Sequence, residues 1–281
     1  MKLARPIRKL LKLPLTLPLQ ISFVRQRVAF ELKYRWFRDL EIAIPLSNGF
    51  YCPISVIDSV HSFSEIFVNN EYGSFLQKMP LPKRWIDLGC HAGYFTLYLA
   101  WRNAVNGRSD WRALLIDADP RMKELTDATI RLNRLEPCCV LLWGLISKER
   151  GEHEFALRAG MGSSGDLSVG DASEVRRVRS IPPEEIIKLL APPYDLVKVD
   201  IEGAEYDFLE GYSKVYSNTS WILIEWHSSD RDGSGQERVM RVLEPQGFHL
   251  MGTVRGKREC ELDGRWFSSG VQLYRSKRLT G

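Results

Sequence analysis

Residues 84–104 read RWIDLGCHAGYFTLYLAWRNA: a short apolar run, a turn that contains two glycines, and a helix-length segment. The apolar run has almost no polar alternation, which is typical of a strand buried on both faces of a sheet. Similar runs recur downstream with helix-length segments between them: ALLIDA (113–118), VLLWGLIS (140–147), DLVKVDI (195–201) and WILIEWH (221–227). Strands that alternate with helices predict an α/β fold with a doubly wound, mostly parallel sheet.

Two further runs near the C-terminus, FHLMGTV (248–254) and GVQLYRS (270–276), flank a charged stretch that contains glycine. They predict an antiparallel pair at one edge of the sheet, which brings the sheet to seven strands. Pro80 and Pro82 mark a junction upstream of the first strand. We therefore expect a helical or irregular extension over 1–80, which packs on the main domain or caps its active site, and a main domain over 81–281.

The composition is that of an ordinary globular protein. The 281 residues are 44% hydrophobic and 26% charged, which argues against disorder and coiled coil. No stretch approaches the ~18 uninterrupted apolar residues of a membrane-spanning helix. The five cysteines are odd in number and lack C-x-x-C spacing, so we expect reduced thiols in a cytoplasmic protein.

The net charge of +4 conceals an asymmetry, because residues 1–38 contain ten Lys or Arg and a single acid, Glu31. This segment carries +9 and the remainder −5, so the basic pI does not indicate a nucleic-acid groove and no nucleic-acid partner is expected. Residues 21–40 alternate basic and aromatic side chains and predict an amphipathic helix. That helix either packs on the domain or contacts an anionic membrane surface or an acidic partner.

The ends of the first two predicted strands suggest a ligand. The first strand ends near Asp87, before a turn from Gly89 to Gly93, and ligands of open α/β sheets bind beyond such strand ends. The G-x-x-x-G spacing lacks the pyrophosphate fingerprint, so a ligand without phosphates fits better. The second strand ends at Asp117, whose two oxygens could accept both ribose hydroxyls. Each feature alone is also explained by a tight connection or a helix cap, but together they favour an adenosine ligand.

Several segments resemble one known family. DLGCHAGYFT (87–96) and LIDADP (115–120) are similar to the glycine-rich and acidic motifs of class I S-adenosylmethionine-dependent methyltransferases. Within that group, the segments similar to the FkbM-type methyltransferases are KVDIEGAE (198–205), IEWH (224–227) and EIFVNNEYGSFL (65–76). The resemblance covers roughly residues 60–230, and KVDIEGAE is its most specific segment.

This resemblance implies a Rossmann-like domain that binds S-adenosylmethionine. The implied cofactor-binding residues are Asp87, Gly89, Cys90, His91, Gly93, Asp117, Ala118 and Tyr72. Ala118 stands where the family often has proline, and Cys90 and His91 lie in a turn that usually carries smaller residues.

Methyl transfer from a sulfonium requires alignment of the acceptor with the methyl carbon and removal of the acceptor's proton. The candidates for this chemistry follow the fourth and fifth predicted strands: His227, Asp200, Glu225 and Glu202. Glu225 and His227 are two residues apart on a strand, so they project to the same face. We expect His227 to accept the proton, because an unperturbed histidine has a pKa of about 6.5. Glu205 is better explained as a first-turn carboxylate of the following helix.

Two features allow a second interpretation. Asp200, Glu225 and His227 could instead hold a divalent metal, for which magnesium or manganese would suit the oxygen-rich ligands. The Gly/Ser-rich stretch GMGSSGDLSVGD (160–171) is either a flexible connection or a lid over the acceptor.

The resemblance implies O-methyl transfer to a hydroxyl of a small molecule or glycan, such as a polysaccharide sugar or a natural product. Two alternatives remain: a catalytically inactive cofactor-binding partner in a biosynthetic assembly, and an RNA methyltransferase anchored by the basic N-terminus. The acidic residues between 200 and 227 argue against an inactive partner, and the lack of a base-flipping motif argues against an RNA methyltransferase. The sequence identifies neither the acceptor nor the oligomeric state.

Overall fold

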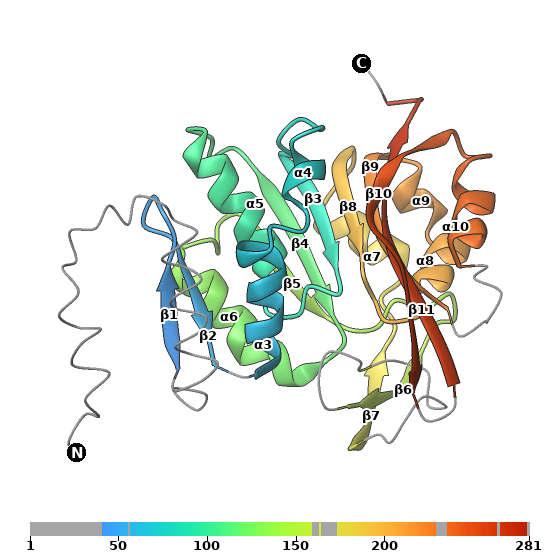
Figure 1. Ribbon diagram of the computed structural model, residues 1–281, viewed down its shortest axis with the longest axis horizontal. Helices are drawn as coiled ribbons and strands as arrows, with labels where there is room; N and C mark the ends of the chain where they lie inside the picture. The colour runs from blue at the N-terminus through green and yellow to red at the C-terminus, as the bar shows by residue number, and fades with distance from the viewer. Residues whose placement is uncertain are drawn as a thin grey trace.

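The computed structural model describes residues 41–55, 57–158, 163, 173–228, 235–262 and 265–279. Its centre is a seven-stranded sheet with the order β10-β11-β9-β8-β3-β4-β5 (Figure 1). The strands are β3 (Arg84–Leu88), β4 (Arg112–Asp117), β5 (Cys139–Trp143), β8 (Tyr194–Val199), β9 (Thr219–Ser228), β10 (Phe248–Leu262) and β11 (Arg265–Ser276). Strands β5, β4, β3, β8 and β9 pair in parallel. β11 runs antiparallel to both of its neighbours, β9 and β10, so β10 points in the same direction as the parallel strands. The predicted mostly parallel sheet with an antiparallel edge pair is confirmed.

Helices cover both faces of the sheet because the central strands are apolar on both sides. On β3, Trp85 packs into one core cluster and its neighbour Ile86 into the other, and Leu196 and Val197 of β8 divide in the same way. The helices are α3 (Ile57–Phe63), α4 (Gly73–Leu76), α5 (Tyr94–Val105), α6 (Lys123–Leu132), α7 (Pro183–Leu189), α8 (Glu205–Gly211), α9 (Ser213–Tyr216) and α10 (Gly235–Leu243), with a π-helical turn η1 (Ser64–Val68) and a 3-10 turn η2 (Pro120–Met122).

The region before β3 shares its core with the sheet. A small antiparallel hairpin, β1 (Ile42–Pro45) and β2 (Tyr51–Ile54), precedes α3. Ile44, Phe63 and Tyr72 belong to the same buried cluster as Trp85 of the sheet. The predicted helix over 21–40, and the loop over 160–171 apart from Ser163, lie outside the described residues.

A second small ribbon consists of β6 (Glu152–Leu157) and β7 (Glu174–Arg179), which pair antiparallel. The apolar pattern of the sequence did not indicate it, because β7 is mostly exposed and rich in charged residues. Among the described residues, no helix is both long and apolar enough to cross a membrane.

The turn between β3 and α5 brings two strand ends together. Gly89 has φ +71°, and a Cβ atom there would lie 1.6 Å from the carbonyl oxygen of Asp200, just beyond β8. Gly93 has φ +74° and immediately precedes the first residue of α5. Because only glycine tolerates both this conformation and this close approach, Gly89 lets the β3 turn touch the end of β8.

Candidate functional site

A cavity lies at the carboxyl ends of the parallel strands, where ligands of this architecture bind. Nine of the residues singled out from the sequence line it: Tyr72, Gly89, Cys90, His91, Asp117, Ala118, Asp200, Glu202 and Glu225. Asp87, Gly93 and His227 do not line it. The fold thus brings together residues that are far apart in the sequence, while three predicted site residues are not part of the lining.

Asp117, the last residue of β4, occupies one end of the cavity. Its Oδ2 accepts a hydrogen bond from the backbone N–H of His91 at 2.6 Å, and its Oδ1 accepts one from the N–H of Asp119 at 2.8 Å. Burial raises the pKa of Asp117 to about 6, although both backbone hydrogen bonds oppose this rise. Each carboxylate oxygen can accept more than one hydrogen bond, so Asp117 keeps acceptor capacity for a ligand.

Asp87 is fully buried beneath the glycine turn and supports it indirectly. Thr96 donates a hydrogen bond to Asp87 at 2.8 Å, and the ammonium of Lys198 lies 3.7 Å from the other carboxylate oxygen. Lys198 in turn donates to the Gly89 carbonyl at 3.2 Å and pairs with Asp200 at 3.1 Å. Burial raises the pKa of Asp87, while the charge of Lys198 opposes the shift. Asp87 can therefore act on a cofactor only through the turn.

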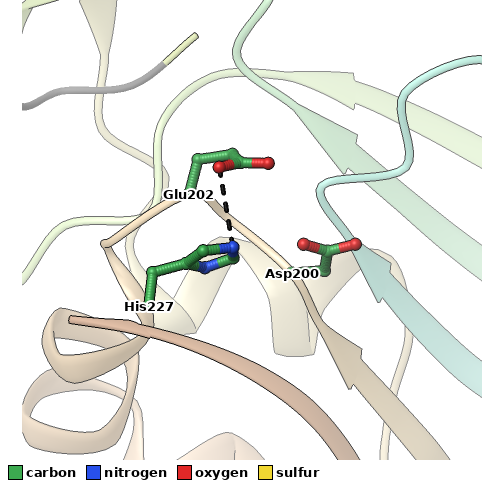
Figure 2. A group of neighbouring side chains, drawn as sticks. All are labelled: Asp200, Glu202 and His227. Carbon is green, nitrogen blue, oxygen red and sulfur yellow. Dashed lines mark ion pairs between the residues drawn. The ribbon is translucent and has the colours of Figure 1, made fainter. Parts of the chain in front are cut away.

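The opposite end of the cavity holds an acidic group around His227 of β9. Figure 2 shows Asp200, Glu202 and His227 converging from the ends of β8 and β9. The Nε2 atom of His227 lies 3.6 Å from a carboxylate oxygen of Glu202 and 3.6 Å from one of Glu225. Glu202 has φ +51°, an unusual backbone conformation for a residue with a side chain, in the turn that follows β8.

Glu205 holds this group in place. It is fully buried at the first position of α8, and its carboxylate accepts backbone hydrogen bonds from Ile201 and Gly203, each at 3.1 Å. The Nδ1 atom of His227 lies 3.0 Å from the same carboxylate. Glu205 is therefore both the first-turn carboxylate expected from the sequence and the partner of His227. Its spacing in KVDIEGAE gave no sign of the second role, which depends on how α8 packs against β9.

These contacts set the charges of the group. Burial alone would lower the pKa of His227, but the charges of Glu205 and Glu202 and the hydrogen bond to Glu205 outweigh it and raise the pKa to about 10. Burial raises the pKa of Glu202 to about 7, against the charge of His227. Burial also acts to raise the pKa of Asp200, but Lys198 and His227 lower it overall. At neutral pH, His227 is thus an imidazolium, and Glu202 titrates.

The possible metal ligands are grouped differently from the sequence prediction. Ligand atoms of Asp200, Glu202 and His227 lie within 4.8 Å of one another, which suits a small divalent cation. Glu225, the third ligand expected from the sequence, instead forms an ion pair with Arg255. Metal binding at this group stays a prediction.

Comparison with known families identifies the domain. Residues 87–250, more than half of the chain, match the family model of the methyltransferase FkbM domain. The chain belongs to this family. The resemblance read from the motifs is confirmed, and this FkbM-family chain is a methyltransferase.

Individual relatives are distant. The chain is 26% identical over 216 residues to a protein of Jannaschia sp. (strain CCS1) described as "Putative methyltransferase", which covers 70% of this chain and 73% of that protein. Among solved structures, it is similar to precorrin-6y C5,15-methyltransferase of Geobacter metallireducens GS-15, with 10% identity, a TM-score of 0.43 and coverage of 75% of this chain and 88% of that one. It is also similar to TYW2 of Pyrococcus horikoshii in complex with MeSAdo, with 12% identity, a TM-score of 0.44 and coverage of 92% and 85%.

Proposed function

We propose that this FkbM-family protein is an S-adenosylmethionine-dependent O-methyltransferase that acts on a hydroxyl of a small molecule or glycan. The observation that carries the proposal is one cavity with a carboxylate at each end, and the two carboxylates have different environments. Asp117 at one end offers fixed acceptor oxygens, and Glu202 at the other end titrates near neutral pH. The first end suits a ribose, and the second suits the removal of a proton.

The cofactor would lie across the glycine turn. Asp117 would accept hydrogen bonds from the ribose hydroxyls, and the turn from Gly89 to Gly93 would hold the methionine end. S-adenosylmethionine supplies an electrophilic methyl group on a sulfonium. The ammonium of Lys198 fixes the Gly89 carbonyl and Asp200, so that the wall of the cavity keeps its shape when the cofactor binds.

Glu202 is the better candidate for the proton acceptor. It lines the cavity, whereas His227 is not among the lining residues and is held as an imidazolium by Glu205 and Glu202. A bound S-adenosylmethionine would supply the methyl group and leave as the neutral thioether, and Glu202 would take up the proton that the acceptor hydroxyl loses when its oxygen is methylated. We thus assign the proton to Glu202 in place of His227, and His227 limits how far the pKa of Glu202 rises.

Binding of the cofactor tests this function directly. Isothermal titration calorimetry should show S-adenosylmethionine binding to the full chain and a loss of about 10- to 100-fold in affinity for Asp117→Asn, since hydrogen bonds to charged groups contribute about 1.5–3 kcal/mol. Asp110→Asn is the matched control, because Asp110 is exposed and pairs with Lys83 at 2.7 Å, away from the cavity lining. Equal affinity of the folded Asp117 variant would refute the ribose assignment, and no binding to the parent would refute the proposed function.

A further inference from the structure

Arg255 reaches the cavity from the C-terminal hairpin. Its side chain is 12% exposed and lines the cavity, although β10 is the outermost strand of the sheet. The register of the β10–β11 pairing shifts between Thr253 and Arg255 and again between Arg255 and Arg258. Irregularities of this kind twist a strand and re-aim its side chains, often beside active sites. The strand is therefore distorted on both sides of Arg255, whose side chain lines the cavity.

The guanidinium of Arg255 connects three parts of the chain. One terminal nitrogen pairs with Glu71, which precedes α4, at 3.2 Å, and the other pairs with Glu225 of β9. The β10 backbone also lies against α4, because a Cβ atom at Gly252 would come within 2.9 Å of the Phe75 ring. Both Arg255 and Glu71 fall outside the 87–250 segment that matches the family model. This corner of the cavity thus combines Glu225, which lies inside the matched segment, with two residues from outside it.

One donor of Arg255 is left over. Within the described part of the chain, the buried Nε–H of Arg255 has no hydrogen-bond partner. A buried donor without a partner is unfavourable, so a ligand oxygen that accepts a hydrogen bond from it would bind more tightly. The other two nitrogens already pair with carboxylates, and Asp200 and Glu202 add negative charge nearby. A neutral oxygen therefore suits this donor better than an anionic one.

We propose that Arg255 binds the acceptor, donating its Nε–H to a neutral oxygen next to the hydroxyl that is methylated, and that the acceptor is a neutral molecule with vicinal hydroxyls, as in a sugar ring. The inference rests on the proposed O-methyl transfer and narrows its substrate class. Glu71 and Glu225 hold the guanidinium in position and balance its charge.

The test measures binding of neutral methyl hexopyranosides to the full chain loaded with S-adenosylhomocysteine, by saturation-transfer NMR. Each glycoside is compared with its monodeoxy partner and with the corresponding uronic acid. We expect a vicinal diol to bind about 10- to 100-fold more tightly than its monodeoxy partner, and more tightly than the uronic acid, in the parent protein. In Arg255→Gln this preference should disappear, while calorimetry shows unchanged binding of S-adenosylhomocysteine.

Two further variants keep the test decisive. Arg255→Lys retains the charge between Glu71 and Glu225 but lacks the Nε–H donor, so it should also lose the preference even if Arg255→Gln fails to fold. Lys257→Gln removes a positive charge from the same strand, where Lys257 pairs with the exposed Glu259, and should behave as the parent. Retained preference in Arg255→Lys, tighter binding of the uronic acid, or no binding of any glycoside to the loaded protein would overturn the inference. Failure of S-adenosylhomocysteine to bind would instead overturn the proposed function.

Discussion

Glu202 is the residue on which the proposed chemistry depends most. Its carboxylate accepts a proton only when ionised, and its pKa is raised by burial to about 7, so turnover should fall as the pH drops through this value. Glu202→Gln should lower turnover by about 10²- to 10⁴-fold and abolish the acidic limb of the pH–rate profile, with cofactor affinity unchanged. Glu237→Gln, an exposed change on α10, is the control for handling and folding. Near-parental turnover of Glu202→Gln would remove the assignment.

A substitution of His227 distinguishes the two candidate proton acceptors, Glu202 and His227. Its positive charge lowers the pKa of Glu202, so His227→Gln should raise the pKa of Glu202 further and move the acidic limb to higher pH. If His227 were the acceptor, as the sequence suggested, the same change would eliminate the limb. The pH–rate profile of the variant, with its amplitude at high pH, distinguishes these outcomes.

The sequence indicated most residues of the site but not their protonation. Asp117 and Glu202 follow from motif and strand-end position, which the chain itself encodes. The imidazolium at His227 depends on Glu205, which the fold places 3.0 Å away across the α8–β9 contact. Arg255 has no motif, because its role arises from a distortion of β10 that no apolar pattern reports.

At the scale of elements, the turn between β3 and α5 is the least tolerant of change. Gly89→Ala would place a Cβ atom 1.6 Å from the Asp200 carbonyl oxygen and force apart β3 and β8. We expect a loss of folding stability of more than about 4 kcal/mol, because exceptional losses accompany strained backbone and overpacking. Gly107→Ala has a similar φ of +69° but no atom within 4 Å of the new Cβ, so it should cost only about 1 kcal/mol. Thermal unfolding of the two variants tests this, and equal losses would show that the close approach does not matter.

Strands could be predicted from the sequence where both of their faces are buried. β3, β4, β8 and β9 are apolar runs because both of their faces are covered, whereas β5 at the sheet edge is only partly buried. The structure has all five strands at the expected places. β10 extends to Leu262, past the predicted end at residue 254. The apolar pattern missed this outer part because it carries charged residues and pairs with β11 at the sheet edge. β1, β2, β6 and β7 are short or exposed, and short exposed strands leave no strong pattern.

At the scale of the molecule, charge is concentrated in residues 1–38, which carry +9. We expect this segment to bind anionic surfaces, so the full chain should float with vesicles that contain acidic lipid and remain free with neutral ones. Changing Arg5, Arg8, Lys9 and Lys12 to Gln should reduce this flotation and its salt dependence. Arg176→Gln with Arg177→Gln is the control, because these residues are exposed on β7 of the folded body. Equal flotation with both kinds of vesicle would contradict the expectation.

The methyl carbon of S-adenosylmethionine can be followed directly through the proposed transfer. The protein is incubated with cofactor labelled at this carbon and with neutral polyhydroxylated acceptors, and carbon NMR monitors the label. We expect the label to appear on an acceptor oxygen and an equal amount of S-adenosylhomocysteine to form. Glu202→Gln should slow this transfer. A label that ends on nitrogen or carbon of the acceptor, or that stays on the bound cofactor throughout, would contradict the proposed transfer.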